Sequence, residues 1–464
     1  MSSSLSREQD TIAAISTGSG GGIGMIRLSG PESIAITSRI FRPQNKNRPL
    51  ESLPGYNGSY GQFFPGEKED PLDDGVVFVY HAPKSYTGEE MAELCCHGGS
   101  LVMERLLALC LREGARLAGP GEFTRRALVN GKLDLTQAES IADIISARSV
   151  QALGAAQEAR RGALFQAAEK VIHQLTDAAA HISAWIDYPE EDVEELLLTQ
   201  LEEILTACQK ELGRLASSYH TGRLLREGIS AAIVGQANVG KSTLMNLLSG
   251  EEKSIVTPIP GTTRDVIRDT VRVGDTLLDL SDTAGLRQTD NQVEMLGVAR
   301  SLELLDRSAL ILAVFDASRE LDTGDYALLE KIRGRLAIGI LNKCDLGEGR
   351  ADREAIARHT CAVVELSAKA GTGVQALEEA IRDAVGTAQL DPAAGMVANQ
   401  RQLDCVLKAA RSLDEAMSAL GWGETLDAVS VVIEEALDAL MELTGQRASQ
   451  EIIDRVFENF CVGK

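Results

Sequence analysis

The amino-acid sequence predicts a multidomain α/β protein in which a domain with a mainly parallel sheet is inserted into an all-helical domain, behind an N-terminal α+β domain. Short β-rich runs separated by Gly and Pro occupy residues 11–132. Apolar residues at helical spacing fill 136–226 and 400–460, and between 228 and 385 apolar strands alternate with amphipathic helices. The 464 residues are enough for two or three cores at about 100–200 residues each.

The N-terminal α+β domain is expected over residues 1–133. Its strands are expected at 24–28, 75–80 and 91–97, with one helix over 101–113. The Gly-rich run at 18–24 is not a dinucleotide fingerprint, because no register gives Gly-x-Gly-x-x-Gly and a strand follows it instead of a helix.

Cys95, Cys96 and His97 suggest a metal site at first sight. Neighbours on a strand point to opposite faces and do not easily bind one ion, so buried strand residues are the better interpretation. The eight cysteines form no Cys-x-x-Cys pair, which favours a reducing, cytoplasmic compartment. No apolar run approaches the roughly 20 residues that span a bilayer, and the first ten residues lack the features of a secretion signal, so no membrane association is expected.

The helical domain is expected in two parts, over 134–226 and 388–464, with the parallel-sheet domain over 227–387 between them. The formal net charge of −22 argues against a chain that coats itself in nucleic-acid phosphate, because such binding needs clustered Lys and Arg. Any contact with RNA must therefore be local or supplied by a partner.

The strongest chemical signal is a phosphate loop. Residues 235–242 read Gly-Gln-Ala-Asn-Val-Gly-Lys-Ser after an apolar strand and open a helix. Backbone N–H groups of such a loop surround phosphates, Lys241 supplies a charge at the β/γ position, and the Ser242 hydroxyl can bind Mg²⁺.

Two further motifs extend this site. Residues 282–285 read Asp-Thr-Ala-Gly at the end of a strand, where Asp282 can hold the Mg²⁺ shell and the Gly285 N–H can meet the γ-phosphate. The loop at 261–265 offers Thr263 as a second Mg²⁺ ligand.

The base-binding motifs indicate guanine. Residues 342–345 read Asn-Lys-Cys-Asp, and the Asp345 carboxylate can accept from guanine N1–H and its 2-amino group, whereas adenine offers it no such donors. Residues 367–369 read Ser-Ala-Lys and supply a backbone N–H near guanine O6. The five motifs in this order predict a Ras-like G domain that binds and hydrolyses GTP. Its expected nucleotide-binding residues are Asn238, Val239, Gly240, Lys241, Ser242, Thr243, Thr257, Pro258, Ile259, Pro260, Gly261, Thr262, Thr263, Asp282, Thr283, Ala284, Gly285, Asn342, Lys343, Asp345, Ser367, Ala368 and Lys369.

The chain lacks the usual residue that orients the attacking water. In Ras-like GTPases a Gln follows the glycine that corresponds to Gly285. This chain has Leu286 at that position, and a leucine side chain cannot activate water. Glu294 is the nearest candidate for orienting the water, and Lys241 is the other expected catalytic residue. The alternative role of Glu294 is that of an acidic residue at a helix N-terminus. Arg287 is either an arginine finger or a solvated, partner-facing residue.

The chain ends in Cys461-Val462-Gly463-Lys464. One interpretation is a frayed basic C-terminus suited to the helix dipole. The other is a reactive Cys461 thiol and an ammonium delivered into a pocket.

Together these features resemble the MnmE (TrmE) family of tRNA modification GTPases. The resemblance rests on the phosphate loop with Asn238, the 257–263 loop, the hydrophobic residue after Gly285 and the 461–464 tail, and it covers the whole chain. The chain departs from the common pattern at Pro258 and Pro260, which stiffen the loop, and at Cys344, which replaces a small residue.

The resemblance implies an N-terminal tetrahydrofolate-binding and dimerisation domain, a helical domain split by the G domain, a homodimer and a complex with the flavoprotein MnmG (GidA), which carries FAD. It implies that the pair modifies C5 of the wobble uridine (position 34) of certain tRNAs to an aminomethyl-type group, with a one-carbon unit from 5-formyl- or methylene-tetrahydrofolate. It further implies folate contacts from Arg27, Glu93, Lys132 and Lys464, potassium ligands Asn238, Thr257, Ile259 and Thr262, magnesium ligands Ser242 and Thr263, and a catalytic Glu294.

Two other functions compete with this one. A ribosome-assembly GTPase would need an RNA-binding module after the G domain, and residues 390–464 show acidic helices instead. A conformational-switch GTPase without modification chemistry would use the N-terminal domain only as an interaction surface.

Overall fold

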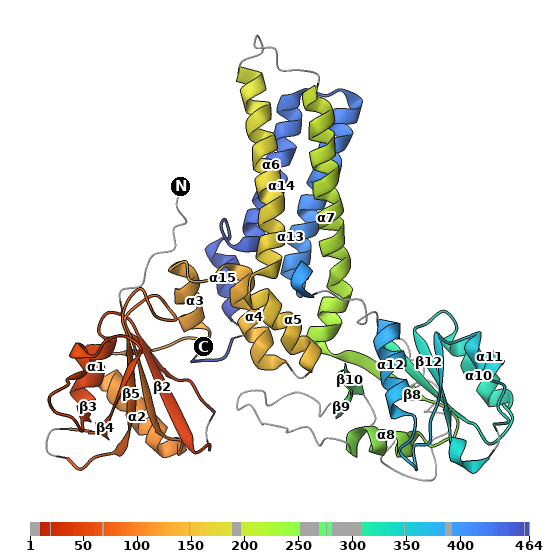
Figure 1. The fold of residues 1–464 in the computed structure, drawn as a ribbon, viewed down its shortest axis with the longest axis horizontal. Coiled ribbons are helices and arrows are strands. Elements are labelled where there is room, and N and C mark those ends of the chain that lie inside the picture. Colours follow the sequence, from red (N-terminus) through yellow and green to blue (C-terminus); the bar gives the residue numbers. More distant parts are fainter. Residues whose placement is uncertain are drawn as a thin grey trace. The chain divides into compact units, whose positions relative to one another are not determined.

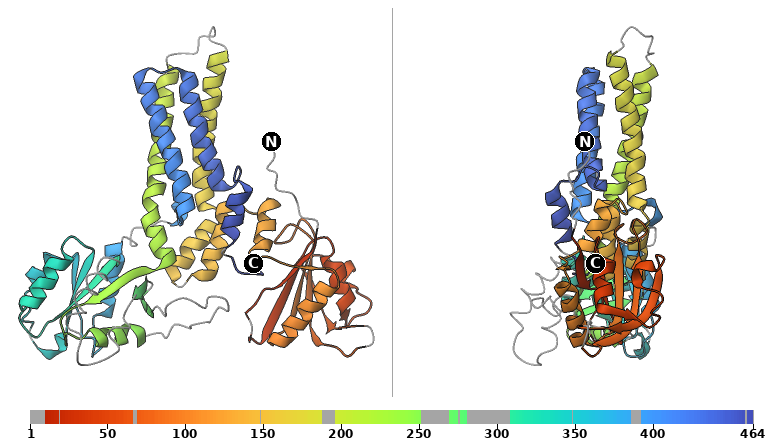
Figure 2. Two further views of the ribbon diagram at one scale, coloured as in Figure 1. Left: turned by 180° about the vertical axis from the view of Figure 1, so that it is seen from behind. Right: turned by 90° about the vertical axis from the view of Figure 1, so that its left-hand side faces the viewer.

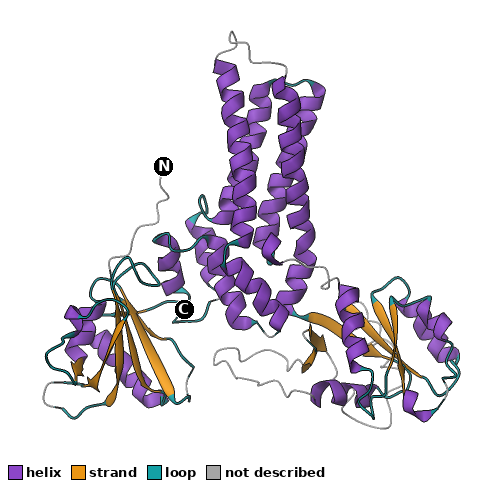
Figure 3. Ribbon diagram, in the orientation of Figure 1, coloured by secondary structure: helices purple, strands orange, loops and turns teal. Residues whose placement is uncertain are grey.

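The computed structural model describes residues 10–18, 20–66, 69–147, 149–187, 196–250, 269–274, 276–280, 308–347, 349–385, 392–458 and 460–463. The described strands form two separate sheets, and helices make up most of the remainder (Figure 3). The chain divides into two compact units, of which the first comprises 1–142, 160–212 and 404–464, and the second comprises 143–159 and 213–403. Among the helices that the structure describes, none is both long and apolar enough to cross a membrane.

The sheet of the first unit has seven strands in the order β3-β4-β5-β6-β2-β1-β7. Neighbouring strands are antiparallel except β1 and β7, which are parallel. The strands are β1 Ile12–Ile15, β2 Ile23–Ser29, β3 Phe41–Pro43, β4 Asn57–Phe63, β5 Asp73–Tyr80, β6 Met91–His97 and β7 Arg116–Leu117.

Two helices cover one face of this sheet, α1 (Ser33–Ile40) and α2 (Ser100–Arg112). The buried residues of β2, β5 and β6 alternate along each strand and pack with these helices in one core, as the two-residue period of a strand requires. The sequence predicted α2 but not α1, nor α3 (Glu122–Val129), because both missed helices are only eight residues long. Figure 1 shows the sheet with α1 and α2 against it.

The rest of the first unit is helical. Long helices α6 (Ala163–Asp187) and α14 (Leu426–Thr444) pack along each other and run side by side in Figures 1 and 2. Gln209 of α7 (Leu196–Glu227) donates to Asp414 of α13 (Gln400–Trp422) at 2.7 Å. The shorter helices of the helical part are α4 Leu135–Ser146, α5 Val150–Arg160, which lies mainly in the second unit, and α15 Gln450–Phe457.

The sheet of the second unit has six strands in the order β13-β12-β11-β8-β10-β9, and all neighbours are parallel except β9 and β10. This confirms the expected mainly parallel sheet, and adds β9, which the sequence did not predict. The strands are β8 Ile229–Val234, β9 Asp269–Val273, β10 Thr276–Leu280, β11 Leu310–Asp316, β12 Ala337–Asn342 and β13 Ala362–Glu365.

Helices cover both faces of this sheet. On one face α8 (Lys241–Gly250) and α12 (Val374–Val385) share a core with the strands, and on the other α10 (Thr323–Ile332) and α11 (Arg353–Ala357) do so. All seven residues of β11 are buried, as expected for a central parallel strand covered on both sides. In such a fold the carboxyl ends of the strands form the ligand-binding edge.

Candidate functional site

The phosphate loop connects β8 to α8, as the sequence predicted. Gly235 has φ 156 and Gly240 has φ 98. A Cβ on Gly235 would lie 2.4 Å from the Val314 carbonyl oxygen, and one on Gly240 would lie 2.2 Å from the Asn342 amide nitrogen. Both positions therefore require glycine, and Asn238, with φ 63, takes the left-handed conformation that asparagine tolerates.

Lys241 lies at the start of α8 and is turned back into the loop. Its ammonium donates to the carbonyls of Gly235 at 2.9 Å and Gln236 at 2.6 Å. Desolvation by burial lowers the pKa of Lys241. A phosphate oxyanion beside the ammonium would act in the opposite direction, because a nearby negative charge favours the charged form of lysine. Ser242 and Thr243 follow in the first turn with exposed side chains.

The buried side chain of Asn342, at the end of β12, joins three motifs. Its Nδ2 donates to the Val239 carbonyl at 2.8 Å, and its Oδ1 accepts from the Ala368 N–H at 2.9 Å. The phosphate loop, the 342–345 motif and the 367–369 motif are thereby fixed to one another. Val239 and Asn342, which are 103 positions apart in the chain, thus meet at one edge of the sheet, because the carboxyl ends of parallel strands lie at the same edge.

Asp345 lies just after β12, within the 342–345 motif. The Ser367 hydroxyl donates to its carboxylate at 2.5 Å and in turn accepts from the Ala370 N–H at 3.2 Å. This fixes the carboxylate beside the loop that carries Ala368 and the exposed Lys369. Such an arrangement can accept two hydrogen bonds from the N1–H and 2-amino edge of a guanine.

Part of the predicted site lies outside the described residues. This holds for the whole 257–263 loop, for the 282–285 motif with Leu286 and Arg287, for Glu294 and for Lys464. The predicted water-orienting group, the second magnesium ligand and three of the potassium ligands therefore stay predictions.

In the first unit, two predicted folate contacts form a pair across the sheet. Arg27 of β2 stands opposite Glu93 of β6 in the strand register, and their side chains form an ion pair of 2.8 Å. Tyr80 donates its hydroxyl to the other oxygen of Glu93 at 2.8 Å. Burial and the Glu93 carboxylate both raise the pKa of Tyr80 well above its usual range, so this phenol stays protonated.

Aromatic rings surround the Arg27 guanidinium. Its central carbon lies 5.3 Å from the ring centroid of Tyr86 and 5.7 Å from that of Phe123, within cation–π range. Sequence reasoning missed Tyr80, Tyr86 and Phe123, because only the strand register and the docking of α3 bring them to Arg27. The set presents a planar cation, a carboxylate and flat apolar rings, a chemistry suited to a polar heterocycle.

Lys132 follows α3 and donates to the Pro83 carbonyl at 3.1 Å. Pro83 belongs to the loop 83–90, and two further contacts join this loop to α3 and the residue after it. Asn130 donates to the Thr87 carbonyl at 2.8 Å, and Tyr86 shares a 2.8 Å hydrogen bond with Thr124. Lys132 and Tyr86 are therefore tied to one another through α3.

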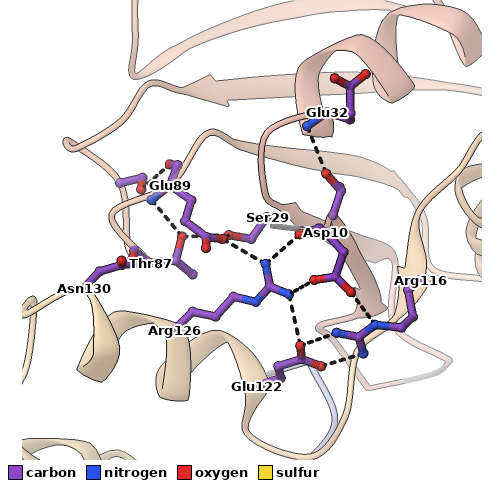
Figure 4. Close-up of polar contacts among 11 residues, drawn as sticks. Asp10, Ser29, Glu32, Thr87, Glu89, Arg116, Glu122, Arg126 and Asn130 are labelled. Carbon is purple, nitrogen blue, oxygen red and sulfur yellow. Dashed lines mark hydrogen bonds and ion pairs between the residues drawn. The ribbon is translucent and has the colours of Figure 1, made fainter. Parts of the chain in front are cut away.

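A buried arginine anchors this assembly (Figure 4). Arg126 of α3, only 5% exposed, pairs with Asp10 at 2.6 Å, Glu122 at 3.1 Å and Glu89 at 3.2 Å. Arg116 holds the same Asp10 and Glu122 at 2.6 Å each. Although burial alone raises the pKa of Glu122, hydrogen bonds from Arg116 and the Gly119 N–H lower it to about 2. The network fixes the 83–90 loop and α3 to the first two strands.

The C-terminal tail docks on the N-terminal domain. Val462 forms an antiparallel bridge with Pro120, Gly121 donates to the Cys461 carbonyl at 3.2 Å, and Ser16 donates to the Gly463 carbonyl at 3.0 Å. The side chain of Cys461 is exposed. The tail is therefore seated on a surface, which contradicts the interpretation that it is frayed.

The Cys95, Cys96 and His97 run is not uniformly buried as expected. Cys96 is buried and Cys95 partly so, but the His97 side chain is 67% exposed, because β6 ends there and its ring reaches Asp73 at 2.7 Å. The hydrogen bond to Asp73 raises the pKa of His97. The two thiols and the imidazole form no common ligand set.

Two family models and several full-length relatives agree with this interpretation of the residues. A family model described as GTP-binding protein TrmE N-terminus matches residues 11–132, and one described as MnmE helical domain matches 135–461. Relatives named tRNA modification GTPase MnmE include those of Symbiobacterium thermophilum, 42% identical over 462 residues, and Bacillus subtilis, 40% identical over 460 residues. Each alignment spans 98% of this chain and 100% of the relative. The solved G domain of the T. maritima FeoB iron transporter is 26% identical, covering 34% of this chain and 98% of that one, with a TM-score of 0.25.

Proposed function

The chain belongs to the MnmE family, and on this premise we propose that it hydrolyses GTP in its second unit and modifies tRNA. The observation that carries the proposal is the joining of three motifs by Asn342, with Asp345 held beside them. A carboxylate fixed at the edge of a nucleotide pocket selects guanine over adenine. The full-length relatives named tRNA modification GTPase support the second part of the proposal.

The proposed product is a wobble uridine (position 34) that carries an aminomethyl-type group at C5. The flavoprotein MnmG, with its FAD, is the proposed partner, and the active form is a homodimer of this chain within that complex. Cytoplasmic tRNA is the proposed substrate, and the net charge of −22 makes the partner the source of most contacts with RNA phosphate.

The one-carbon donor is a reduced folate, bound by the first unit. The Arg27 and Glu93 pair, with Tyr80 and the rings beside it, offers a donor, an acceptor and stacking surfaces for a pterin. Lys132, on the loop held by α3, is available to the anionic glutamate tail. The residues present therefore fit the group.

In the nucleotide site, Mg²⁺ would be held by Ser242 and Thr263, and K⁺ by Asn238, Thr257, Ile259 and Thr262. Asn238, which is exposed and has a left-handed backbone, would offer its amide oxygen to the potassium ion. A potassium ion held there would supply positive charge to the phosphates, a role that an arginine finger fills elsewhere for a factor of about 10³–10⁵. Glu294 orients the attacking water in place of the absent glutamine.

Mass analysis of wobble uridines tests the proposal as a whole. Cells that lack this chain should lose the C5 modification, and wild-type chain should restore it. The Asp345→Asn and Glu93→Ala variants should fail to restore it. A ribosome-assembly or switch function without modification chemistry predicts unchanged wobble uridines in the deleted cells.

Two measurements separate the finer points. GTP turnover in K⁺ should exceed that in Na⁺ at equal ionic strength, rise per molecule with protein concentration, and collapse in Glu294→Ala; equal rates in the two salts would remove the potassium proposal. Calorimetry with 5-formyltetrahydrofolate should show binding that Glu93→Ala weakens, and an unchanged affinity in that variant would remove the folate assignment.

A further inference from the structure

The lysine of the guanine motif has an unusual backbone conformation. Lys343 has φ 67, in the left-handed region that residues other than Gly, Asn and Asp rarely adopt. A non-glycine residue persists there only where its surroundings hold it. Lys343 follows Asn342, which ties the motifs together, and precedes Asp345 by two positions.

The contact that holds Lys343 comes from the neighbouring strand. Asp316, 8% exposed at the end of β11, stands opposite Asn342 in the strand register. Its Oδ2 accepts from the Lys343 ammonium at 2.6 Å, while its Oδ1 accepts from the N–H of Ser318 at 3.0 Å and from its hydroxyl at 2.6 Å. Both carboxylate oxygens of Asp316 are therefore engaged in hydrogen bonds.

Asp316 is ionised at neutral pH. Burial raises the pKa of Asp316, but the hydrogen bonds from Lys343 and Ser318 outweigh it and lower the pKa below its usual range. With its ammonium engaged by Asp316, Lys343 offers a bound base its four-carbon stem, an apolar surface that suits the plane of a purine. The edge of the base is left to Asp345.

The same segment also reaches the phosphate loop. Asp322 caps α10, pairs with Arg319 at 3.1 Å and accepts from the side chain of Gln236, the second residue of the phosphate loop, at 3.3 Å. Residues 316–325 thus contact both the base motif and the phosphate loop.

We propose that Asp316 is a positioning residue for guanine-nucleotide binding, which acts by holding Lys343 so that its stem meets the plane of the base. The inference rests on the proposed binding of guanine nucleotides and deepens it. It predicts that Asp316 matters to binding only while Lys343 is present. A purely structural Asp316 would matter equally with and without Lys343.

A double-mutant cycle on the full chain tests this dependence, with GDP as the probe and calorimetry as the readout. Asp316→Ala should weaken GDP binding about tenfold, as expected for loss of one hydrogen bond to a charged group. The double variant Asp316→Ala/Lys343→Ala should bind no more than about twofold weaker than Lys343→Ala alone. The inference would be overturned if the two single variants' losses of GDP affinity multiplied in the double variant, or if Asp316→Ala bound GDP with wild-type affinity.

The choice of base provides a second readout. Because the stem meets the plane and not the edge of the base, Asp316→Ala should weaken GDP and IDP by the same factor, whereas Asp345→Asn should change their ratio, since IDP lacks the 2-amino group. A selective loss of GDP in Asp316→Ala would contradict the proposed mode of action.

The chain offers a matched control. Arg353 and Glu365 form an ion pair of the same 2.6 Å length in the same unit, but both side chains are more than half exposed. Glu365→Gln should leave GDP affinity within about twofold of wild type. Unfolding midpoints of the nucleotide-free variants check that each remains folded. If the wild-type chain does not bind GDP, the proposed function is wrong. If the wild type binds GDP but the affinity losses of Asp316→Ala and Lys343→Ala multiply in the double variant, only the role of Asp316 is wrong.

Discussion

The nucleotide site and the N-terminal site are assembled in different ways. In the second unit, neutral hydrogen bonds between a side chain and a distant backbone, such as those of Asn342, fix short motifs at the ends of parallel strands. In the first unit, charged side chains from strands and α3 hold one another, with Arg126 among three carboxylates and Arg27 opposite Glu93. The comparison teaches that the first site depends on a network of charges, whereas the second combines backbone geometry with one charged pair, Asp316 and Lys343.

The largest expected effect comes from removing the central charge of the first site. Arg126→Met removes the arginine that pairs with Glu89 and leaves Asp10 and Glu122 with Arg116 alone, and breaking a buried pair such as Arg126 and Glu122 costs about 3–5 kcal/mol. Urea unfolding followed by circular dichroism measures this loss. Arg39→Ala serves as control, because the exposed Arg39 and Glu32 pair of 3.5 Å should contribute at most about 1 kcal/mol. Equal losses in the two variants would show that the network is not what holds the first unit.

A somewhat smaller effect should appear on acidification. The pKa values of Glu122 and Asp10 are lower in the folded chain than in the unfolded chain, so their stabilising contribution is complete above about pH 4.5 and is lost as the pH falls toward 2. We expect the first unit to lose on the order of 2 kcal/mol over this range. Glu122→Gln should flatten the pH dependence of the unfolding free energy, and a slope identical to that of wild type would contradict the assignment.

The Arg27 and Glu93 pair should show a coupling of about 1–2 kcal/mol in a double-mutant cycle on unfolding, because both side chains are less than one-fifth exposed and in contact. Additive effects of Arg27→Ala and Glu93→Ala would mean that the pair is not formed in solution.

The smallest effect is expected at the surface of the second unit. Arg353→Ala removes an exposed pair with Glu365 and should change the unfolding free energy by less than about 1 kcal/mol. A larger change, measured by thermal unfolding, would mean that an exposed ion pair contributes more to the second unit than the Arg39 and Glu32 pair does to the first.

The difference between the two sites also explains which of their residues could be predicted from the sequence. The phosphate loop and the guanine motif are contiguous, so Gly235, Lys241 and Asp345 were predicted from spacing alone, and the strands that carry them were placed to within about two residues. Asp316 was missed because its role depends on a register contact with the neighbouring strand. In the first unit, spacing gave no reason to join Arg27 to Glu93; that came only from the family resemblance. Tyr80, Tyr86 and Arg126 were missed because their contacts with Glu93, Arg27 and Asp10 join residues that lie 13 to 116 positions apart.

The most direct test of the central claim is a change of nucleotide specificity at Asp345. In Asp345→Asn, the amide keeps one accepting oxygen but turns an NH2 donor toward the guanine 2-amino group. One charge-assisted bond is lost, the other becomes neutral and two donors face each other, so GTP affinity should fall by about 100-fold or more. Xanthosine triphosphate, whose 2-oxo group can accept from that amide, should be bound and hydrolysed instead. Turnover of both nucleotides is measured for the wild type and the variant at equal Mg²⁺ and K⁺. A variant that hydrolyses GTP as well as wild type does, with no gain for xanthosine triphosphate, would contradict the assignment of this site.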